Sequence, residues 1–142
     1  MNLVIPLIGY GEELEPFCYS VEDELKIKID KSPRLADQAL EMIAQKEFPL
    51  ILINDTLAAG NLILPHNTVI DDYPQIAQYC SSQIRLSKDN AATPIVALLY
   101  PMKEYVEIRD YRAVGATHCI DMCKTSRVEN INIIKKYLPT AL

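Results

Sequence analysis

The sequence contains no apolar run long enough to cross a lipid bilayer, so we expect no transmembrane helix. Its first residues, MNLVIPLIGYGEE, also lack the basic start and the small-residue cleavage pattern of a secretory signal peptide. The four cysteines are Cys18, Cys80, Cys119 and Cys123. Their irregular spacing fits no disulfide framework, which predicts a cytoplasmic protein whose thiols stay reduced.

Excess positive charge is also missing, because the formal net charge at pH 7 is −5. Nucleic-acid phosphates need a basic face, so we expect no direct binding of nucleic acid. The composition is otherwise that of a globular protein, with 49% hydrophobic and 23% charged residues. The length of 142 residues fits one domain, which we expect to cover residues 1–142.

Three motifs that would indicate chemistry are incomplete. His118 and two nearby cysteines lack the second ligand pair of a zinc site, so we predict no metal centre. Gly9 and Gly11 follow an apolar run as in a dinucleotide-binding loop, but the third glycine position holds Leu14. Neither histidine of the sequence has a nucleophile–base pattern around it, which argues against an enzyme.

Three continuous apolar runs predict strands that are covered on both faces, as in a parallel sheet. They are residues 3–8, 50–53 and 94–99. Residues 25–29 alternate between apolar residues and lysine, which is typical of a half-exposed strand at a sheet edge. A fifth, short strand is expected over residues 117–120.

Capping and stop signals mark the helices expected between these strands. Ser32 followed by Pro33 is typical of a helix start, and apolar residues then recur at helical spacing through Lys46. Further helices are expected directly after residue 72 and over residues 103–114, where Gly115 supplies the stop. Residues 9–24 mix glycine, proline and acidic residues and give no clear pattern.

The last helix has a capping-box pair, Ser126 and Glu129. The residues expected on its core face are Val128, Ile131, Ile134 and Leu138. Strands that alternate with helices predict a doubly wound α/β fold with helices on both faces of a parallel sheet. Ligands and chemistry in such folds gather at the carboxyl ends of the strands.

Two stretches of the sequence resemble the receiver domains of response regulators, the CheY-like family. The first is PLILINDTLAAG, residues 49–60, and the second is TPIVALLY, residues 93–100, followed by DYRAVGATHCID, residues 110–121. The resemblance covers roughly residues 25–138. It implies a three-layer α/β/α fold with a five-stranded parallel sheet in the order 2-1-3-4-5, also called flavodoxin-like.

In such a family an aspartate accepts a phosphoryl group with the help of Mg²⁺. The resemblance places Asp55 at the acceptor position, or Asn54 if the match slips by one residue. At the acidic pair that helps to hold the metal stand Leu7 and Ile8, which cannot bind a hard cation.

Two further positions that read the phosphate also depart from the family. Leu99 replaces the hydroxyl residue after the fourth strand, and Met122 replaces the lysine after the fifth, while Lys124 comes two residues late. Phosphoryl transfer depends on neutralising negative charge, so an incoming phosphoryl group would meet Asp55 with little compensation. The sequence therefore predicts a pseudo-receiver that signals by protein contacts, with no cofactor.

Two alternatives stay open. In the first, Glu12 or Glu13 supplies an unusual Mg²⁺ site and Asp55 is phosphorylated. In the second, the apolar residues at the strand ends form a crevice that binds a small ligand or nucleotide.

The expected partner is a signalling protein, namely a kinase, an output domain or a second copy of the chain, and not a membrane. Tyr100, Tyr105 and Tyr111 cluster around the fourth helix and are candidates for the contact surface, because tyrosine is favoured at interfaces; the alternative is a half-buried structural role. The apolar segment 61–72 departs from the family pattern and either covers the sheet or docks another protein. No output domain is recognised, so we expect a chain that stands alone or was excised from a longer one.

Overall fold

A computed structural model describes residues 3–61, 73–100 and 105–139 of the chain. The segment 61–72 that departs from the family pattern lies outside the described residues from 62 onward. The elements, in chain order, are β1 (Val4–Ile8), the 3₁₀ helix η1 (Glu12–Leu14), α1 (Glu15–Leu25), β2 (Lys28–Asp30), α2 (Ala36–Ile43), β3 (Ile51–Asn54), α3 (Tyr73–Leu86), β4 (Ile95–Leu99), α4 (Tyr105–Ala113), β5 (His118–Asp121) and α5 (Arg127–Tyr137).

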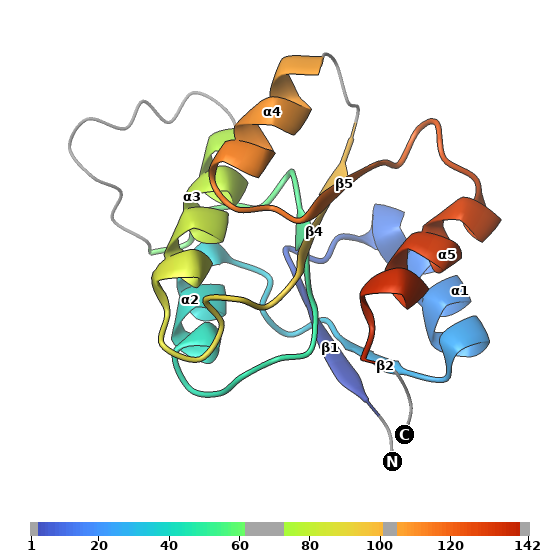
Figure 1. Cartoon of the computed structure of the whole chain (residues 1–142), viewed down its shortest axis with the longest axis horizontal. Coiled ribbons are helices and arrows are strands. Elements are labelled where there is room, and N and C mark those ends of the chain that lie inside the picture. The colour runs from blue at the N-terminus through green and yellow to red at the C-terminus, as the bar shows by residue number, and fades with distance from the viewer. Residues whose placement is uncertain (1–2, 62–72, 101–104, 140–142) are drawn as a thin grey trace.

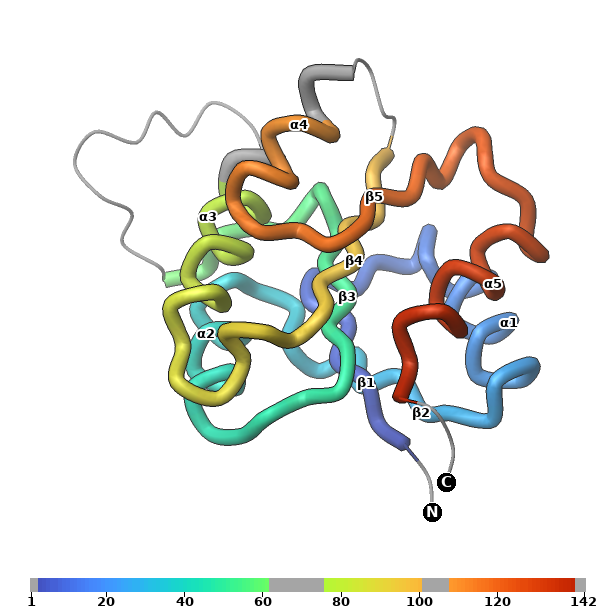
Figure 2. The backbone as a smooth tube through the Cα atoms, viewed as in Figure 1, coloured from blue at the N-terminus to red at the C-terminus, as the bar shows by residue number. Residues whose placement is uncertain are grey.

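The five strands form one parallel sheet in the order β2-β1-β3-β4-β5, which confirms the predicted fold class. Helices α1 and α5 cover one face, and α2, α3 and α4 cover the other (Figure 1). The first and last helices, far apart in the sequence, lie side by side (Figure 2). None of the described helices is both long and apolar enough to span a bilayer.

Each face of the sheet has its own apolar core. Alternate residues of a strand point to opposite faces, so Ile51 and Ile53 join the core under α2, α3 and α4. Leu50 and Leu52 join the core under α1 and α5. By the same alternation, the side chain of Asp55, at the carboxyl end of β3, points to the face that α2, α3 and α4 cover.

The amino-terminal end of the sheet is fastened by two polar side chains. Arg85 of α3 donates to the backbone oxygens of Thr93 (2.6 Å) and Gly115 (2.7 and 2.9 Å), which precede β4 and β5. Asn90 accepts from the N–H of Phe48 (2.9 Å) and donates to the backbone oxygen of Ile43 (3.0 Å). The entries to β3, β4 and β5 are thus held by side chains from the loop and helix that precede β4.

Two predicted element starts are wrong. The edge strand predicted over residues 25–29 is present as β2, but it begins only at Lys28, because Leu25 ends α1 and Lys26 adopts a left-handed conformation (φ 53°). The helix predicted from Ser32 begins only at Ala36. The residues between β2 and α2 form a loop, in which the Pro33 oxygen accepts a hydrogen bond from the N–H of Gly9 (2.9 Å).

The helix signals near the C-terminus are confirmed, with one exception. The Ser126 hydroxyl accepts from the Glu129 N–H, and the Glu129 carboxylate accepts from the Ser126 N–H, both at 3.2 Å. Gly115 has a φ of 103° two residues after the end of α4, as expected of a helix stop. Val128 was expected on the core face but is exposed, and Asn130 is buried on α5 beside the predicted core residue Ile134.

Candidate functional site

The carboxyl end of β3 carries a buried carboxylate. Asp55 follows the last residue of the strand, its N–H donates to the Leu98 oxygen (3.0 Å), and only 3% of the residue is exposed. The hydroxyl of Tyr111, on α4, donates a hydrogen bond to Asp55 Oδ1. Tyr111 is itself completely buried, so this bond lies in the core and not at a surface.

The position of Tyr111 corrects its prediction as a surface residue. It packs in the core under α2, α3 and α4, where its ring fills space and its hydroxyl finds an acceptor. Tyr100 is half-buried after β4, and the side chain of Tyr105 lies outside the described residues. Of the three tyrosines, therefore, the structure places one in the core and one at a partly covered position.

Asn54, the alternative acceptor position, has a structural role. It is buried on the opposite face of the sheet from Asp55, and its amide donates to the Gly9 oxygen (2.8 Å) and to Glu13 Oε1 (3.3 Å). Its side-chain oxygen accepts from the Thr56 N–H (3.3 Å). These bonds tie the end of β3 to the turn after β1.

Four apolar residues stand at the carboxyl ends of the strands, as the sequence indicates. Leu7 and Ile8 of β1 and Leu99 of β4 are completely buried. Met122, just after β5, is half-buried on the α1–α5 side, and its N–H donates to the Leu99 oxygen (3.1 Å). These positions therefore offer hydrocarbon and thioether surface where polar groups would be needed to hold an anion or a metal.

Asp121, the last residue of β5, was missed by the sequence analysis. It is 6% exposed and pairs in register with Leu99, and its Oδ1 accepts from the Cys123 N–H (3.0 Å). The ammonium of Lys124 lies 3.9 Å from Asp121 Oδ2. The signal was present, because residues at strand ends are candidates in this fold, but the family comparison directs attention to Met122 instead.

Burial shifts the pKa values of three thiols and of one imidazole near the sheet. Burial raises the pKa of Cys18 and of Cys80 to about 12 and that of Cys119 to about 11. All four cysteines are free. Burial first, and then the positive charges of Lys136 and Arg112, lower the pKa of His118. The buried thiols are thus protonated at neutral pH and are poor nucleophiles.

No protein-family model matches the chain, and no curated protein matches it significantly in sequence. Solved structures do match over almost the whole length. The receiver domain of a sensor histidine kinase from Pseudomonas aeruginosa PAO1, described with a magnesium ion coordinated in its active-site cleft, superposes with a TM-score of 0.70 at 14% identity, covering 96% of this chain and 98% of that one. This chain has the receiver fold.

Other receivers give the same result. A chemotaxis response regulator of Vibrio cholerae has a TM-score of 0.68 at 13% identity, with 97% of this chain and 99% of that chain covered. A response regulator from Hahella chejuensis has a TM-score of 0.68 at 16% identity, covering 96% of each chain. The resemblance inferred from two short motifs is therefore confirmed at the level of the fold, and the low identities leave the chemistry to the residues of the site.

A magnesium ion does not fit the residues at this site. Mg²⁺ prefers carboxylate, carbonyl and water oxygens in an octahedral shell, and the buried side chains of Leu7 and Ile8 supply none. Glu13 comes near the sheet, but it bonds to Asn54, which lies on the opposite face from Asp55. Within the part of the chain that the structure describes, no three His, Cys, Asp or Glu residues are grouped so that they could hold a metal.

Proposed function

We propose that this chain is a pseudo-receiver, a single signalling domain that works through protein contacts without Mg²⁺-dependent phosphorylation of Asp55 and without enzymatic activity. The observation that carries the proposal is the buried hydrogen bond from Tyr111 to Asp55. A phosphoryl donor needs an exposed carboxylate oxygen and nearby positive charge. Here the carboxylate is covered, and its neighbours at the strand ends are Leu99 and, on β1, Ile8.

The test is incubation of the purified chain with acetyl phosphate and Mg²⁺, followed by intact-mass measurement. We expect no stoichiometric adduct, because the donor cannot reach Asp55 Oδ1 without displacing Tyr111. A conventional receiver treated in parallel shows that the donor is active. The matched variant is Asp55→Asn, which keeps the shape of the side chain but cannot form an acyl phosphate.

One result contradicts the proposal directly. This is an adduct of one phosphoryl group that is stable in acid, labile in base and absent from Asp55→Asn. An adduct that persists in Asp55→Asn lies elsewhere and leaves the Asp55 proposal standing.

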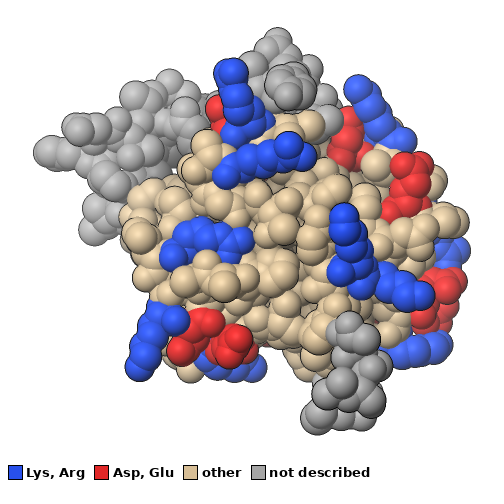
Figure 3. All heavy atoms as spheres, viewed as in Figure 1, with Lys and Arg blue, Asp and Glu red and all other residues tan. Residues whose placement is uncertain are grey.

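The proposed contact surface is the face formed by α4, β5 and α5, and its partner is a signalling protein with an acidic surface. The exposed basic residues of the two helices include Arg109 and Arg112 on α4 and Lys135 and Lys136 on α5. Arg112 and Lys136 both act on the pKa of His118, so positive charge from α4 and from α5 gathers around β5. In Figure 3 basic side chains stand out on this side of the molecule in separate groups, with acidic side chains beside several of them.

The charge of this face can be tested by reversal. The double variant Arg112→Glu, Lys136→Glu should lose a partner that the native chain retains, and native binding should weaken as salt rises. Lys26→Glu is the control, because the side chain of Lys26 is 82% exposed at the end of α1. A purified partner that binds the double variant as tightly as the native chain contradicts this surface. Free cysteines support a cytoplasmic location for the complex.

A further inference from the structure

The outer surface of α1 and α5 presents apolar side chains to solvent. Tyr19 of α1 and Val128 of α5 are each 66% exposed, and among the described residues they are two of the four large apolar side chains that stay exposed. The two helices lie next to each other, so both residues belong to one side of the molecule (Figure 1). Exposed apolar groups on neighbouring elements are typical of a contact surface.

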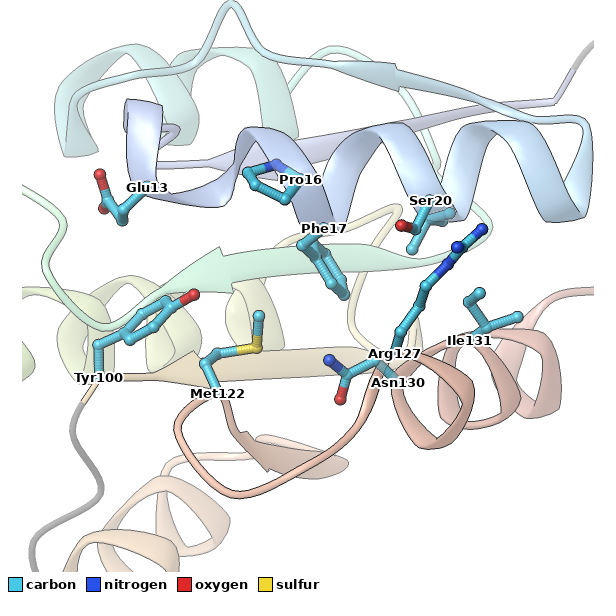
Figure 4. A pocket seen from close by; sticks show the side chains of 10 residues that line it. Glu13, Pro16, Phe17, Ser20, Tyr100, Met122, Arg127, Asn130 and Ile131 are labelled. Carbon is cyan, nitrogen blue, oxygen red and sulfur yellow. The ribbon is translucent and has the colours of Figure 1, made fainter.

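The same surface is hollowed at two places. A cavity of about 320 Å³ lies between the helices, where Figure 4 shows Phe17 pointing inward from α1 and Arg127 reaching from α5 toward α1. A second hollow, of about 310 Å³, lies mainly on α5, and its lining includes Val128, Ile131 and Asn132. Arg127 and Ile131 line both hollows, so the two adjoin. This side of the molecule therefore has both projecting side chains and recesses.

The charges of the two helices have opposite signs. α1 carries four acidic residues and no basic one, whereas α5 carries three basic residues and one acidic one. Within the chain, Arg127 of α5 already pairs with Glu24 of α1 (3.3 Å between Nη2 and Oε1). A second copy turned by a two-fold rotation places its α5 on α1 of the first copy, and its α1 on α5. Both contacts join an acidic helix to a basic one, so the surface is complementary to itself.

We propose that α1 and α5 form the interface of a two-fold dimer of this chain, in which Tyr19 of each copy packs against Val128 of the other. The aromatic ring enters the hollow on α5 and buries apolar surface of both residues. The charged residues of the two helices surround this contact. A partner with charges of one sign repels one of the two helices, whereas a second copy attracts both.

The size of the surface sets the strength of the dimer. Each helix has 11 residues and is about 16 Å long and 10 Å wide, so the pair presents a few hundred Å² per copy. A standard stable interface buries about 800 Å² per partner, so we expect a weak dimer with a dissociation constant of about 10–500 μM. The interface uses no residue of α4 or β5 and does not depend on the proposed function.

Sedimentation equilibrium of the native chain, from about 1 μM to 1 mM, tests the dimer. We expect the mean mass to rise from that of one chain toward that of two. Tyr19→Lys and Val128→Glu should each weaken association at least about tenfold, because each places a charge against an apolar group. The control is Leu86→Glu, because Leu86 is 78% exposed on α3, on the other face of the sheet, and should leave association unchanged.

An equimolar mixture of Tyr19→Lys and Val128→Glu tests which helices meet. In a mixed dimer, one contact joins the two introduced charges, which have opposite signs, and the other is the native contact of Tyr19 with Val128. The mixture should therefore associate more strongly than either variant alone. Thermal melts at about 1 μM, where the chain is a single copy, establish that each variant is folded.

Three results would overturn this inference. One is the mass of a single chain at about 1 mM. A second is association of Tyr19→Lys or Val128→Glu as strong as that of the native chain, which places the contact elsewhere. A third is a mixture that associates no more strongly than its components, which shows that α1 does not meet α5. None of these measurements uses a phosphodonor or another protein, so this inference and the proposed function fail independently.

Discussion

The two faces of the sheet differ sharply at its carboxyl-terminal end. On the α2–α4 face, Asp55 is covered by α4 and its carboxylate is bonded to the buried hydroxyl of Tyr111. On the α1–α5 face, a cavity remains open and the buried oxygen of Asn130 has no donor among the described residues. The fold has thus covered the carboxylate of Asp55 on one face and left room on the other. The role of a buried polar group can therefore be judged only together with its hydrogen-bond partner.

The largest effect on stability is expected from removing the ring of Tyr111, which packs in the core on the side of Asp55. Tyr111→Ala should lower the free energy of unfolding by about 3–5 kcal/mol, because it leaves a large cavity in a packed core. Denaturant titration measures this loss. The control, Tyr19→Ala, changes an exposed tyrosine and should stay within about 0.5 kcal/mol of the native chain. A loss below about 1 kcal/mol for Tyr111→Ala would mean that α4 does not pack as described.

A smaller effect isolates the hydrogen bond itself. In a double-mutant cycle of Tyr111→Phe and Asp55→Ala, we expect a coupling free energy of about 1.5–3 kcal/mol, as for a hydrogen bond to a charged acceptor. Denaturant titration of the four proteins provides the values. Additive effects of the two substitutions would show that the bond adds nothing to stability, and the difference between the two faces would then reduce to packing alone.

The smallest effect on the free energy of unfolding is expected on the open face, where the sign of the change is informative. Asn130→Leu removes a buried oxygen that lacks a donor and replaces it with an apolar group of similar size. We expect stability to change by less than about 1 kcal/mol, or to rise, in the absence of any ligand. Thermal and denaturant melts measure it. A loss of several kcal/mol would show that Asn130 already has a strong partner in the folded chain.

The sequence predicted the sheet better than it predicted the edges of the helices. The apolar runs that became β1, β3 and β4 are buried on both faces and have few other interpretations. The alternating pattern at residues 25–29 predicted the edge strand too early, because the end of α1 depends on the left-handed Lys26, for which a lysine gives no signal. Local pattern cannot reveal a turn that tertiary packing enforces.

The positions of the candidate-site residues at the strand ends could be predicted, but their hydrogen bonds and burial could not. The receiver resemblance pointed to Asp55, Leu99 and Met122, which the structure has at the carboxyl ends of strands, and it also supplied the order of the strands. The sequence could not show that Tyr111 reaches Asp55 across 56 positions of the chain, because such a contact follows from the packing of α4 on the sheet. It also could not pick Asn130 as buried, since a polar residue on a short amphipathic helix is expected to face water.

The contacts at the amino-terminal end of the sheet limit which substitutions the fold tolerates. Arg85 holds the backbone before β4 and β5, and a side chain added at Gly115 would come within 2.5 Å of the Arg85 Cγ. A side chain at position 115 is therefore disfavoured both by the positive φ of Gly115 and by the side chain of Arg85. A substitution at Gly115 would therefore displace the Arg85 side chain and loosen the backbone before both β4 and β5 at once.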